Sequence, residues 1–414
     1  MANQTDATVK YLINQMYPKG LADATFRDPE NTFLAMVSKN PDAVGDEFQV
    51  AVQYSRGAGR SADYATAKRN INGGAGVRFR FPYADIYQFA QVPAKEWKAA
   101  MRNGGVTNIL DQKFRNAMRG MKQDLAVGAA GDGSGTVGQI RNLATGGGGY
   151  PYTNSPATPA GAFRVVEWRT LNTLDQGMVL QSNPARVGAP GSMRAGTAVV
   201  TKIDRDNGDV FFTATNGWAP VANDYIYIEG DYGAKMNGVR AWIPDVAPVT
   251  GDSFGFVDRS VDSMRLAGIR VDQTSAGTYE KALVLGMEKF RTYGAGTDYI
   301  FTSPYDYTRL EDELGAKKRI VDIPNRYELG LTGIKMADGS VIVQDPWFPK
   351  NRAYPLSMET WSLESIDDAP HWVDEDGLKM LRDSNFDGFN AIMRAWVNLK
   401  CEDPSRNGVI ILPN

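Results

Sequence analysis

The most chemically suggestive pattern in this sequence is a run of glycines at Gly133, Gly135 and Gly138. G-x-G-x-x-G is typical of dinucleotide-binding loops, which need a strand before the glycines and a helix after them. Here the apolar residues of Val106 to Leu125 recur at three- and four-residue steps, which predicts a helix before the glycines instead. The first acidic residue downstream is Glu167, not the ribose-binding acid about twenty positions on. The glycines are therefore better explained by a loop that needs positive φ and close chain approach.

A second candidate chemistry is general-base catalysis by His371, the single histidine, which lies between Asp367 and Asp376. An α/β hydrolytic enzyme using His371 is therefore one interpretation of the chain. The sequence contains no nucleophile elbow, no P-loop and no second histidine for a metal, so nothing else supports it. Cys401 is the only cysteine, and a buried, inert thiol is its simplest interpretation. We therefore assign no catalytic, cofactor-binding or metal-ligating residue from the sequence.

The stretch from Asp204 to Asp209 has the composition of a calcium-binding loop. Its glycine, Gly208, falls at the fifth position, and no glutamate closes the loop, so the calcium pattern fails. Asn207 and Gly208 lie between two alternating stretches, 198–203 and 210–215, which favours a β-hairpin turn.

Charge is unevenly distributed although the net charge is only −3. Residues 56–122 contain 13 Lys/Arg against four Asp/Glu, whereas residues 359–387 contain nine Asp/Glu against two basic residues. Two solvated faces would explain this asymmetry, and so would opposite patches that meet between neighbouring copies of the chain. If opposite patches meet, the predicted inter-subunit contact residues are basic on one side and acidic on the other. They are Arg56, Arg60, Lys68 and Arg69 on the basic side, and Asp367, Asp368, Asp374, Glu375 and Asp376 on the acidic side.

The elements that must position these residues begin with an arm and a hairpin. Residues 1–46 carry too few apolar residues to fold alone, and short helices are expected at 7–16 and 30–37. Apolar and polar residues alternate over 48–54 and 77–81, which predicts two strands of a long hairpin with a polar, glycine-rich tip. Such a hairpin is marginal by itself and needs a partner surface.

The rest of the chain predicts an α+β protein. Strands within 163–229 indicate a small barrel or sandwich inserted into a larger fold. A helix is expected over 279–293 with Leu283, Met287 and Phe290 on one face, and a long strand over 389–399. No apolar run reaches the length of a membrane span.

Several segments resemble the major capsid proteins of tailed bacteriophages, whose subunits have the Hong Kong 97-type fold. They keep a consistent order over about 280 residues: Leu125 to Ile140 (the end of a spine helix), Phe254 to Asp262, Asp298 to Pro304, Ala369 to Arg382, and Arg406 to Ile410.

The resemblance implies a domain for each part of the chain. The implied division is a 1–46 N-terminal arm, a 47–92 E-loop hairpin, a 93–140 P-domain spine helix, a 141–245 inserted β-rich domain, a 246–355 A-domain, and a 356–414 return to the P-domain and C-terminus.

The resemblance also implies partners and a location. The chain is expected to contact other copies of itself in hexamers and pentamers, and to form a virion capsid in the host bacterial cytoplasm. It would enclose double-stranded DNA without sequence-specific binding, and it would not contact a membrane. A portal and a separate scaffolding protein are expected, because only 46 residues precede the hairpin. A tail component or adhesin is a further alternative, given the β-rich insertion.

Overall fold

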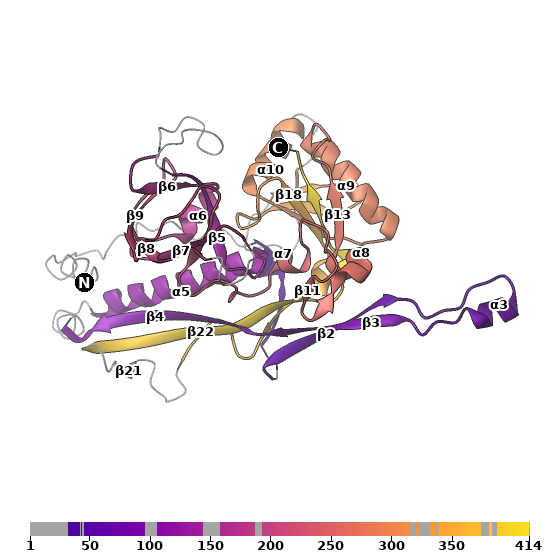
Figure 1. The fold of residues 1–414 in the computed structure, drawn as a ribbon, viewed down its shortest axis with the longest axis horizontal. Helices are drawn as coiled ribbons and strands as arrows, with labels where there is room; N and C mark the ends of the chain where they lie inside the picture. Colours follow the sequence, from indigo (N-terminus) through magenta and orange to yellow (C-terminus); the bar gives the residue numbers. More distant parts are fainter. Residues whose placement is uncertain are drawn as a thin grey trace.

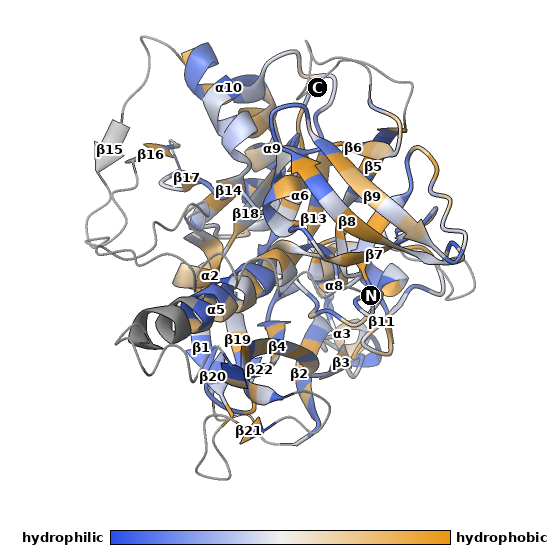
Figure 2. Cartoon of the chain, turned by 90° about the vertical axis from the view of Figure 1, so that its left-hand side faces the viewer, coloured by the Kyte–Doolittle hydropathy of each residue, from blue (hydrophilic) through white to orange (hydrophobic). Residues whose placement is uncertain are grey.

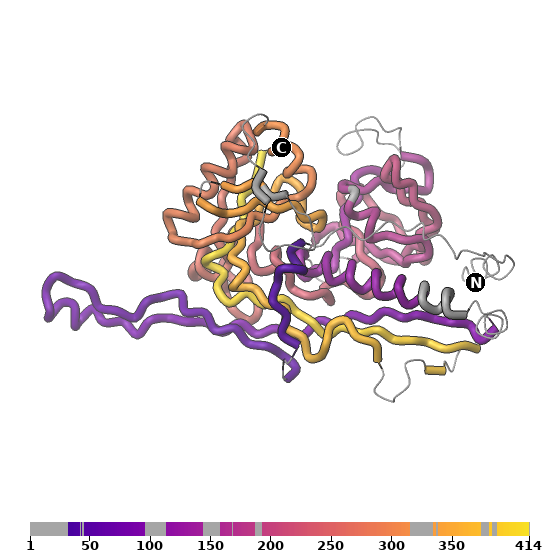
Figure 3. Tube along the Cα trace, turned by 180° about the vertical axis from the view of Figure 1, so that it is seen from behind, coloured from indigo at the N-terminus to yellow at the C-terminus, as the bar shows by residue number. Residues whose placement is uncertain are grey.

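The computed structural model describes residues 32–413 except 42, 44, 96–105, 144–157, 187–192, 315–319, 323–331, 337, 374–380 and 383–386. Figure 1 shows an extended lower sheet with a long helix on it, a closed barrel above that helix, and a second sheet beside the barrel. A hairpin projects far from these parts, as the reverse view in Figure 3 also shows. The helix expected at 7–16 lies outside the described residues. No helix among the described residues meets the length and hydropathy that a membrane span requires.

The lower sheet is organised around its longest strand, β22 (Gly388–Cys401), which confirms the strand expected over 389–399. It pairs antiparallel with β4 (Ala84–Pro93) along that strand's whole length and with β19 (Trp361–Ser365). Three short strands complete the sheet: β1 (Ser38–Asn40), β20 (His371–Trp372) and β21 (Leu381–Arg382).

Helix α5 (Val106–Ala130) lies along this sheet and buries Ala117, Met121 and Leu125, as its apolar spacing predicts. The helix ends at Ala130, inside the glycine-rich stretch 128–138 that follows the apolar repeat in the sequence. Gly128 itself is still helical, and a Cβ at this position would lie 2.9 Å from Met236 Cγ. Glycine here allows close approach within the helix.

The projecting hairpin consists of β2 (Glu47–Ser55) and β3 (Ala75–Pro82), which pair antiparallel as predicted. Only the base of the hairpin is packed, because alternate residues such as Phe79 and Phe81 are buried against Trp242. A short helix, α3 (Tyr64–Arg69), forms the tip and has no buried residue. The base is therefore part of the main core, whereas the tip is not.

The inserted β-rich region is a closed barrel of antiparallel strands, which confirms the expected barrel or sandwich. The barrel core is apolar, and its strands are largely orange in Figure 2. A buried ion pair crosses between two barrel strands, where Arg164 Nε lies 2.7 Å from Asp209 Oδ1. Around the barrel the strands follow in the order β10 (Tyr225–Ile228), β5 (Thr136–Leu143), β6 (Ala162–Val165), β9 (Asp209–Thr215), β8 (Thr197–Asp204) and β7 (Val179–Asn183), with α6 (Trp168–Thr173) beside them.

The turn between β8 and β9 is a hairpin, as the Asn207-Gly208 pair predicts. The Asp204 carboxylate is hydrogen-bonded within the turn: it accepts from the Asp206 and Asn207 amides and from the Asn207 side chain. Hydrogen bonds to Asn207 and Asp206 lower the pKa of Asp204, so the carboxylate is stabilised by the turn itself. Among the described residues no cluster of acids, His or Cys could hold a metal ion.

The second sheet has seven strands and is flanked by α9 (Tyr279–Tyr293) and α10 (Pro304–Leu314). Leu283, Met287 and Phe290 of α9 are buried as predicted. The strand order is β13 (Ile269–Asp272), β23 (Gly408–Ile411), β18 (Arg352–Leu356), β14 (Tyr299–Thr302), β17 (Val341–Gln344), β16 (Thr332–Lys335) and β15 (Ile320–Asp322).

The last strand, β23, differs from the expected course of the chain. We placed 356–414 with the spine region, but 408–411 runs parallel to β13 and antiparallel to β18, inside the seven-stranded sheet. The sequence Gly-Val-Ile-Ile explains this position, because a strand covered on both faces reads as a continuous apolar run. β22 is therefore the last strand along the chain that belongs to the lower sheet.

Short elements connect these parts. Between the barrel and the second sheet the chain forms α7 (Val239–Trp242), a tight hairpin of β11 (Ser253–Phe254) and β12 (Val257–Asp258), and α8 (Ser263–Ala267).

The first described element, α2 (Thr32–Met36), fits the helix expected at 30–37 and is fixed where the two sheets meet. Phe33 is buried with its ring edge-on to Phe301 and Trp361, at centroid distances of 5.4 and 6.0 Å. The Phe33 amide donates a 2.9 Å hydrogen bond to Asp345 Oδ2, and the Trp347 amide donates to Oδ1 at 3.0 Å. Burial raises the pKa of Asp345 to about 6, although these amide hydrogen bonds oppose the shift.

Asp345 should make the stability of the subunit depend on pH. Because its pKa is raised from 3.8 to about 6 in the folded chain, the folded state binds more protons between these values. The contribution of Asp345 to the free energy of unfolding should therefore be greatest below pH 4 and fall by up to about 3 kcal/mol as the pH rises through 6. Urea unfolding at pH 4 to 7 should show this slope in the wild type, after subtraction of the profile of Asp345→Asn. Parallel profiles for the two proteins would contradict the prediction.

Candidate functional site

A cavity of about 500 Å³ lies where the barrel, the end of α5 and the start of β18 in the second sheet meet. The glycine loop between α5 and β5 forms part of its wall. Gly133 and Gly135 have φ angles of +78° and +77°. A Cβ on Gly135 would lie 2.0 Å from the Asp231 carbonyl oxygen, and one on Gly138 would lie 2.2 Å from Thr170 Oγ1. The glycines therefore permit close packing of the loop, and helix α5 precedes them while strand β5 follows, opposite to a dinucleotide site.

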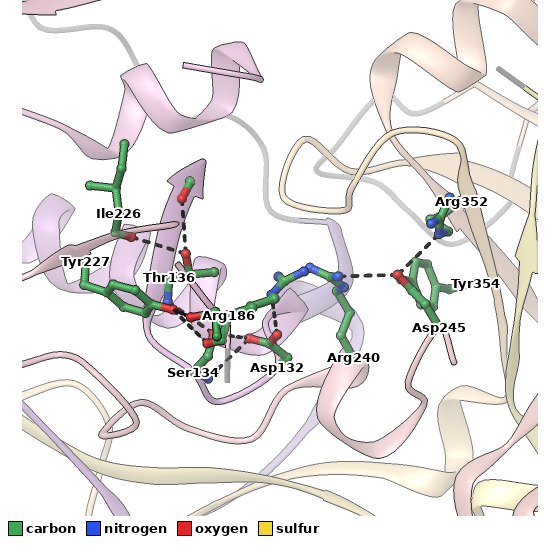
Figure 4. Close-up of polar contacts among 12 residues, drawn as sticks. Asp132, Ser134, Thr136, Arg186, Ile226, Tyr227, Arg240, Asp245, Arg352 and Tyr354 are labelled. Atoms are coloured by element: carbon green, nitrogen blue, oxygen red, sulfur yellow. Dashed lines mark hydrogen bonds and ion pairs between the residues drawn. The ribbon is translucent and has the colours of Figure 1, made fainter. Parts of the chain in front are cut away.

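One side of the cavity is held by an ion pair between the glycine loop and the barrel (Figure 4). Asp132 Oδ2 lies 2.5 Å from Arg186 Nε, and the Ser134 hydroxyl donates to Asp132 Oδ1 at 2.6 Å. The Tyr227 hydroxyl donates to the Arg186 carbonyl at 2.7 Å and so fixes the segment that carries this arginine. Burial opposes ionisation of Asp132, but Arg186 and Arg240 overcome it and hold its pKa below the ordinary value.

The other side is held by Asp245, which follows α7. Its Oδ2 lies 3.5 Å from Arg240 of α7 and 3.3 Å from Arg352 of β18, and the Tyr354 hydroxyl donates to Oδ1 at 3.0 Å. Burial opposes ionisation here too, and the two arginines and the Tyr354 hydrogen bond lower the pKa of Asp245. A third contact, between Lys235 Nζ and Asp124 of α5, measures 2.6 Å. These pairs connect the barrel, α5 and the second sheet, so the cavity is a structural junction.

The two residues considered for catalysis do not line this cavity. His371 lies on β20 of the lower sheet, where its Nδ1 is 2.7 Å from the Asp368 carbonyl and Arg394 Nε donates to its Nε2 at 3.2 Å. Both ring nitrogens are thus engaged in structural contacts. Cys401 is fully buried, and burial raises its thiol pKa, which keeps the sulfur protonated and unreactive as expected.

The hairpin tip brings the four predicted basic residues together. Arg56 and Arg60 follow β2, Lys68 and Arg69 lie on α3, and all four are exposed. Asp63 caps α3 by accepting a 2.8 Å hydrogen bond from the Thr66 amide, so the single acid of the tip has a local role. The tip is a cationic surface held far from the chain's own core.

The tip also exposes apolar surface. Tyr64 and Ile71 are 83% and 66% exposed, and large apolar side chains at such exposure are typical of contact surfaces when they gather in one place. From the sequence only the charge of this region was apparent, because isolated apolar residues in a polar stretch give no periodic signal.

Of the predicted acidic partners, Asp367 and Asp368 are exposed in the turn before β20. Asp374, Glu375 and Asp376 lie outside the described residues. The structure therefore places the first two in a turn next to the lower sheet, whereas the basic tip projects far from that sheet (Figure 1).

The ionic junction around the cavity was not predicted from the sequence. Its members come from four separate segments of the chain, and each is an ordinary charged residue in its own context: Asp124 and Asp132, Arg186, Lys235 to Asp245, and Arg352. No spacing within one segment could have revealed it.

Comparison with known proteins extends this description. No protein-family model matches the sequence, and no curated protein matches it. Among solved structures, a chain of the cyanophage A-1(L) capsid asymmetric unit has a TM-score of 0.55 at 12% identity, covering 96% of this chain and 98% of that one. A chain from the capsid of the native GTA particle has a TM-score of 0.43 at 10% identity, covering 98% of this chain and 96% of that one. The encapsulin of the holo-SrpI complex from Synechococcus elongatus PCC 7942 also has a TM-score of 0.43, at 8% identity, with 95% and 93% covered.

The match to the cyanophage chain extends over nearly all of both chains and identifies this protein as having a capsid-subunit fold. In particular, it is the Hong Kong 97-type fold, of mixed α+β class, that the sequence segments resemble.

Proposed function

We propose that this chain is the major capsid protein of a tailed double-stranded-DNA bacteriophage, a structural protein that assembles through hexamers and pentamers into an icosahedral shell. The observation that carries the proposal is the projecting hairpin on a fold that matches a phage capsid chain over 96% of this sequence. An isolated two-stranded hairpin is marginal in water, so its exposed length requires another surface. A neighbouring copy supplies that surface, and such interfaces in obligate assemblies bury on the order of thousands of Å².

In this proposal each structural part has a role in the shell. The hairpin β2–β3 is the E-loop, α5 with the lower sheet is the P-domain, the barrel is the inserted domain, and the seven-stranded sheet is the A-domain. The pairing of β4 with β22 supports grouping β4 with the P-domain in this proposal, and the pairing of β23 with β13 supports grouping β23 with the A-domain. Residues 1–46 form the arm.

The charges of the hairpin tip fit an inter-subunit contact. In the proposal Arg56, Arg60, Lys68 and Arg69 meet the acidic segment Asp367 to Asp376 of a neighbour. The exposure of the four tip cations and of Asp367 and Asp368 supports the pairing. Exposed ion pairs are individually worth about 0–1 kcal/mol, so the contact depends on the whole set and on its repetition around a symmetric ring.

Reversing two tip charges should impair assembly without unfolding the subunit. For the double variant Arg56→Glu/Arg60→Glu we expect the protein concentration needed for assembly to rise about tenfold or more, because two attractions become repulsions in every copy. Light scattering across a concentration series measures this threshold, and circular dichroism checks the fold.

The matched control is Lys202→Glu/Lys281→Glu, which makes the same change in net charge at exposed lysines of the barrel and of α9. It should assemble like the wild type. Normal assembly of the tip variant at low salt would refute the charge pairing.

The proposal as a whole is tested by size-exclusion chromatography and negative-stain microscopy of the purified chain. Shell particles, or hexameric and pentameric rings, are the expected result. A stable monomer whose melting temperature responds to a small molecule would favour an enzyme instead, and fibres or tubes would favour a tail component.

The proposed setting of this shell follows the same assignment. It would assemble in the bacterial cytoplasm with a separate scaffolding protein and a portal, and then enclose DNA in the virion. The net charge of −3 is compatible with this, because a strongly cationic wall would bind DNA through counterion release and retain it.

A further inference from the structure

The tight hairpin of β11 and β12 exposes a large aromatic residue in a strained conformation. Its two-residue turn consists of Gly255 and Phe256, whose φ angles are +56° and +64°. Turns with two positive φ angles favour Asn, Asp and Gly, and a bulky residue there is a genuine outlier. Phe256 is also 81% exposed, so the ring gains almost nothing from its own subunit.

The turn is held rigidly against the base of the projecting hairpin. The Arg80 amide of β3 donates to the Gly255 carbonyl at 3.2 Å, and a Cβ on Gly255 would lie 2.5 Å from the Phe81 ring. Phe254 packs on Phe81 at a centroid distance of 4.7 Å, while the Arg259 guanidinium lies 4.1 Å from the Phe254 ring. The backbone that carries Phe256 is therefore fixed against the base of the hairpin, whose projecting part is proposed to contact a neighbour.

Phe256 is not alone on this segment. Val246, Val249 and Val261 are 77%, 71% and 63% exposed, so residues 246–261 contribute four of the large apolar side chains that the described residues expose. Aromatic residues fixed among smaller apolar neighbours are typical anchors of protein interfaces.

We propose that Phe256 is an anchor that becomes buried against a second copy of this chain during assembly. The inference rests on the proposed self-assembly and adds a specific contact to it. An exposed ring on a strained backbone does not stabilise the isolated subunit. Glycine at position 256 would accept the positive φ angle and would expose no apolar side chain. A second copy is the occupant, because the turn is built on the base of the hairpin that reaches toward a neighbour.

The test is the pair of effects produced by Phe256→Gly. The melting temperature of the unassembled subunit should stay the same or rise by about 1–3 °C, because the strained residue is relieved. The yield of particles should fall by about tenfold or more, because the anchor is lost. Phe256→Tyr and Phe256→Trp keep an aromatic ring and should retain assembly, and Tyr293→Ala, which removes an exposed aromatic residue from α9, should assemble normally.

The outcomes separate this inference from the proposed function. If the wild type forms no particles, the proposed function fails. If the wild type forms particles and Phe256→Gly forms them equally well, assembly stands and the anchor is refuted. Phe256→Asn serves as a second variant, because asparagine also accepts positive φ. Unfolding of both the glycine and the asparagine variants would show that the ring stabilises the subunit itself, and would also overturn the inference.

Discussion

Phe33→Ala is expected to lower the free energy of unfolding of the subunit by about 3–5 kcal/mol, the range for removing a fully buried phenylalanine. The ring lies between the two sheets, edge-on to Phe301, Phe348 and Trp361 at centroid distances of 5.4–6.0 Å. Neighbours that belong to two different sheets cannot easily close the space that alanine would leave. Urea unfolding of the unassembled subunit, followed by tryptophan fluorescence, measures the loss.

The matched control lies on the same short helix. Leu34→Ala shortens a side chain that is only partly buried, so it should cost about 1 kcal/mol. Equal losses for the two variants would mean that α2 contributes through its helix alone and not through the Phe33 ring.

A second expected consequence of Phe33→Ala is easier proteolysis near residue 32, because the ring and Asp345 together hold this segment.

Removing Asp209 from the barrel is expected to be as damaging, at about 3–5 kcal/mol for Asp209→Ala. Arg164 and Asp209 are 0% and 1% exposed, and their two hydrogen bonds measure 2.7 and 2.8 Å. The alanine variant leaves a buried guanidinium without its carboxylate, which is costly in an apolar core. Thermal unfolding followed by circular dichroism should show the loss.

The control removes both charges at once. Arg164→Met/Asp209→Leu replaces the pair by apolar side chains of similar length, and it should recover most of the stability lost by Asp209→Ala. A double variant as unstable as the single one would show that the shape of the pair matters more than its charge. Neither variant changes the projecting β2–β3 hairpin, so under the proposed function any folded fraction should still assemble.

The sequence predicted those parts of the fold that depend on neighbouring residues. The helix over 279–293 and the hairpin strands carry strong periodicity over many residues, and the structure confirms them. The prediction of a hairpin turn at Asn207-Gly208 was correct, because two residues are enough to define such a turn. The barrel was expected as a barrel or sandwich, since alternation reveals strands but not whether they close.

Features that depend on distant residues could not be predicted. Asp345 receives amide hydrogen bonds from a segment 312 residues away, and nothing near it in the chain indicates this. The sheet that contains β23 was not predicted, because an apolar tetrapeptide such as residues 408–411 fits the interior of either sheet. At the candidate contact surface, composition gave the basic tip, but the exposed position of Phe256 required the backbone geometry of a single turn.

The position of β23 has a consequence for when the subunit matures during synthesis. Strand β23 lies between β13 and β18, so β13, which is made much earlier, has no strand partner until residues 408–411 have been made, whereas β18 already pairs with β14. Formation of the lower sheet is delayed in the same way, because β4 can pair only after β22 has been made. A nascent chain therefore cannot complete the lower sheet before residues 388–401, or the seven-stranded sheet before residues 408–411, have been translated.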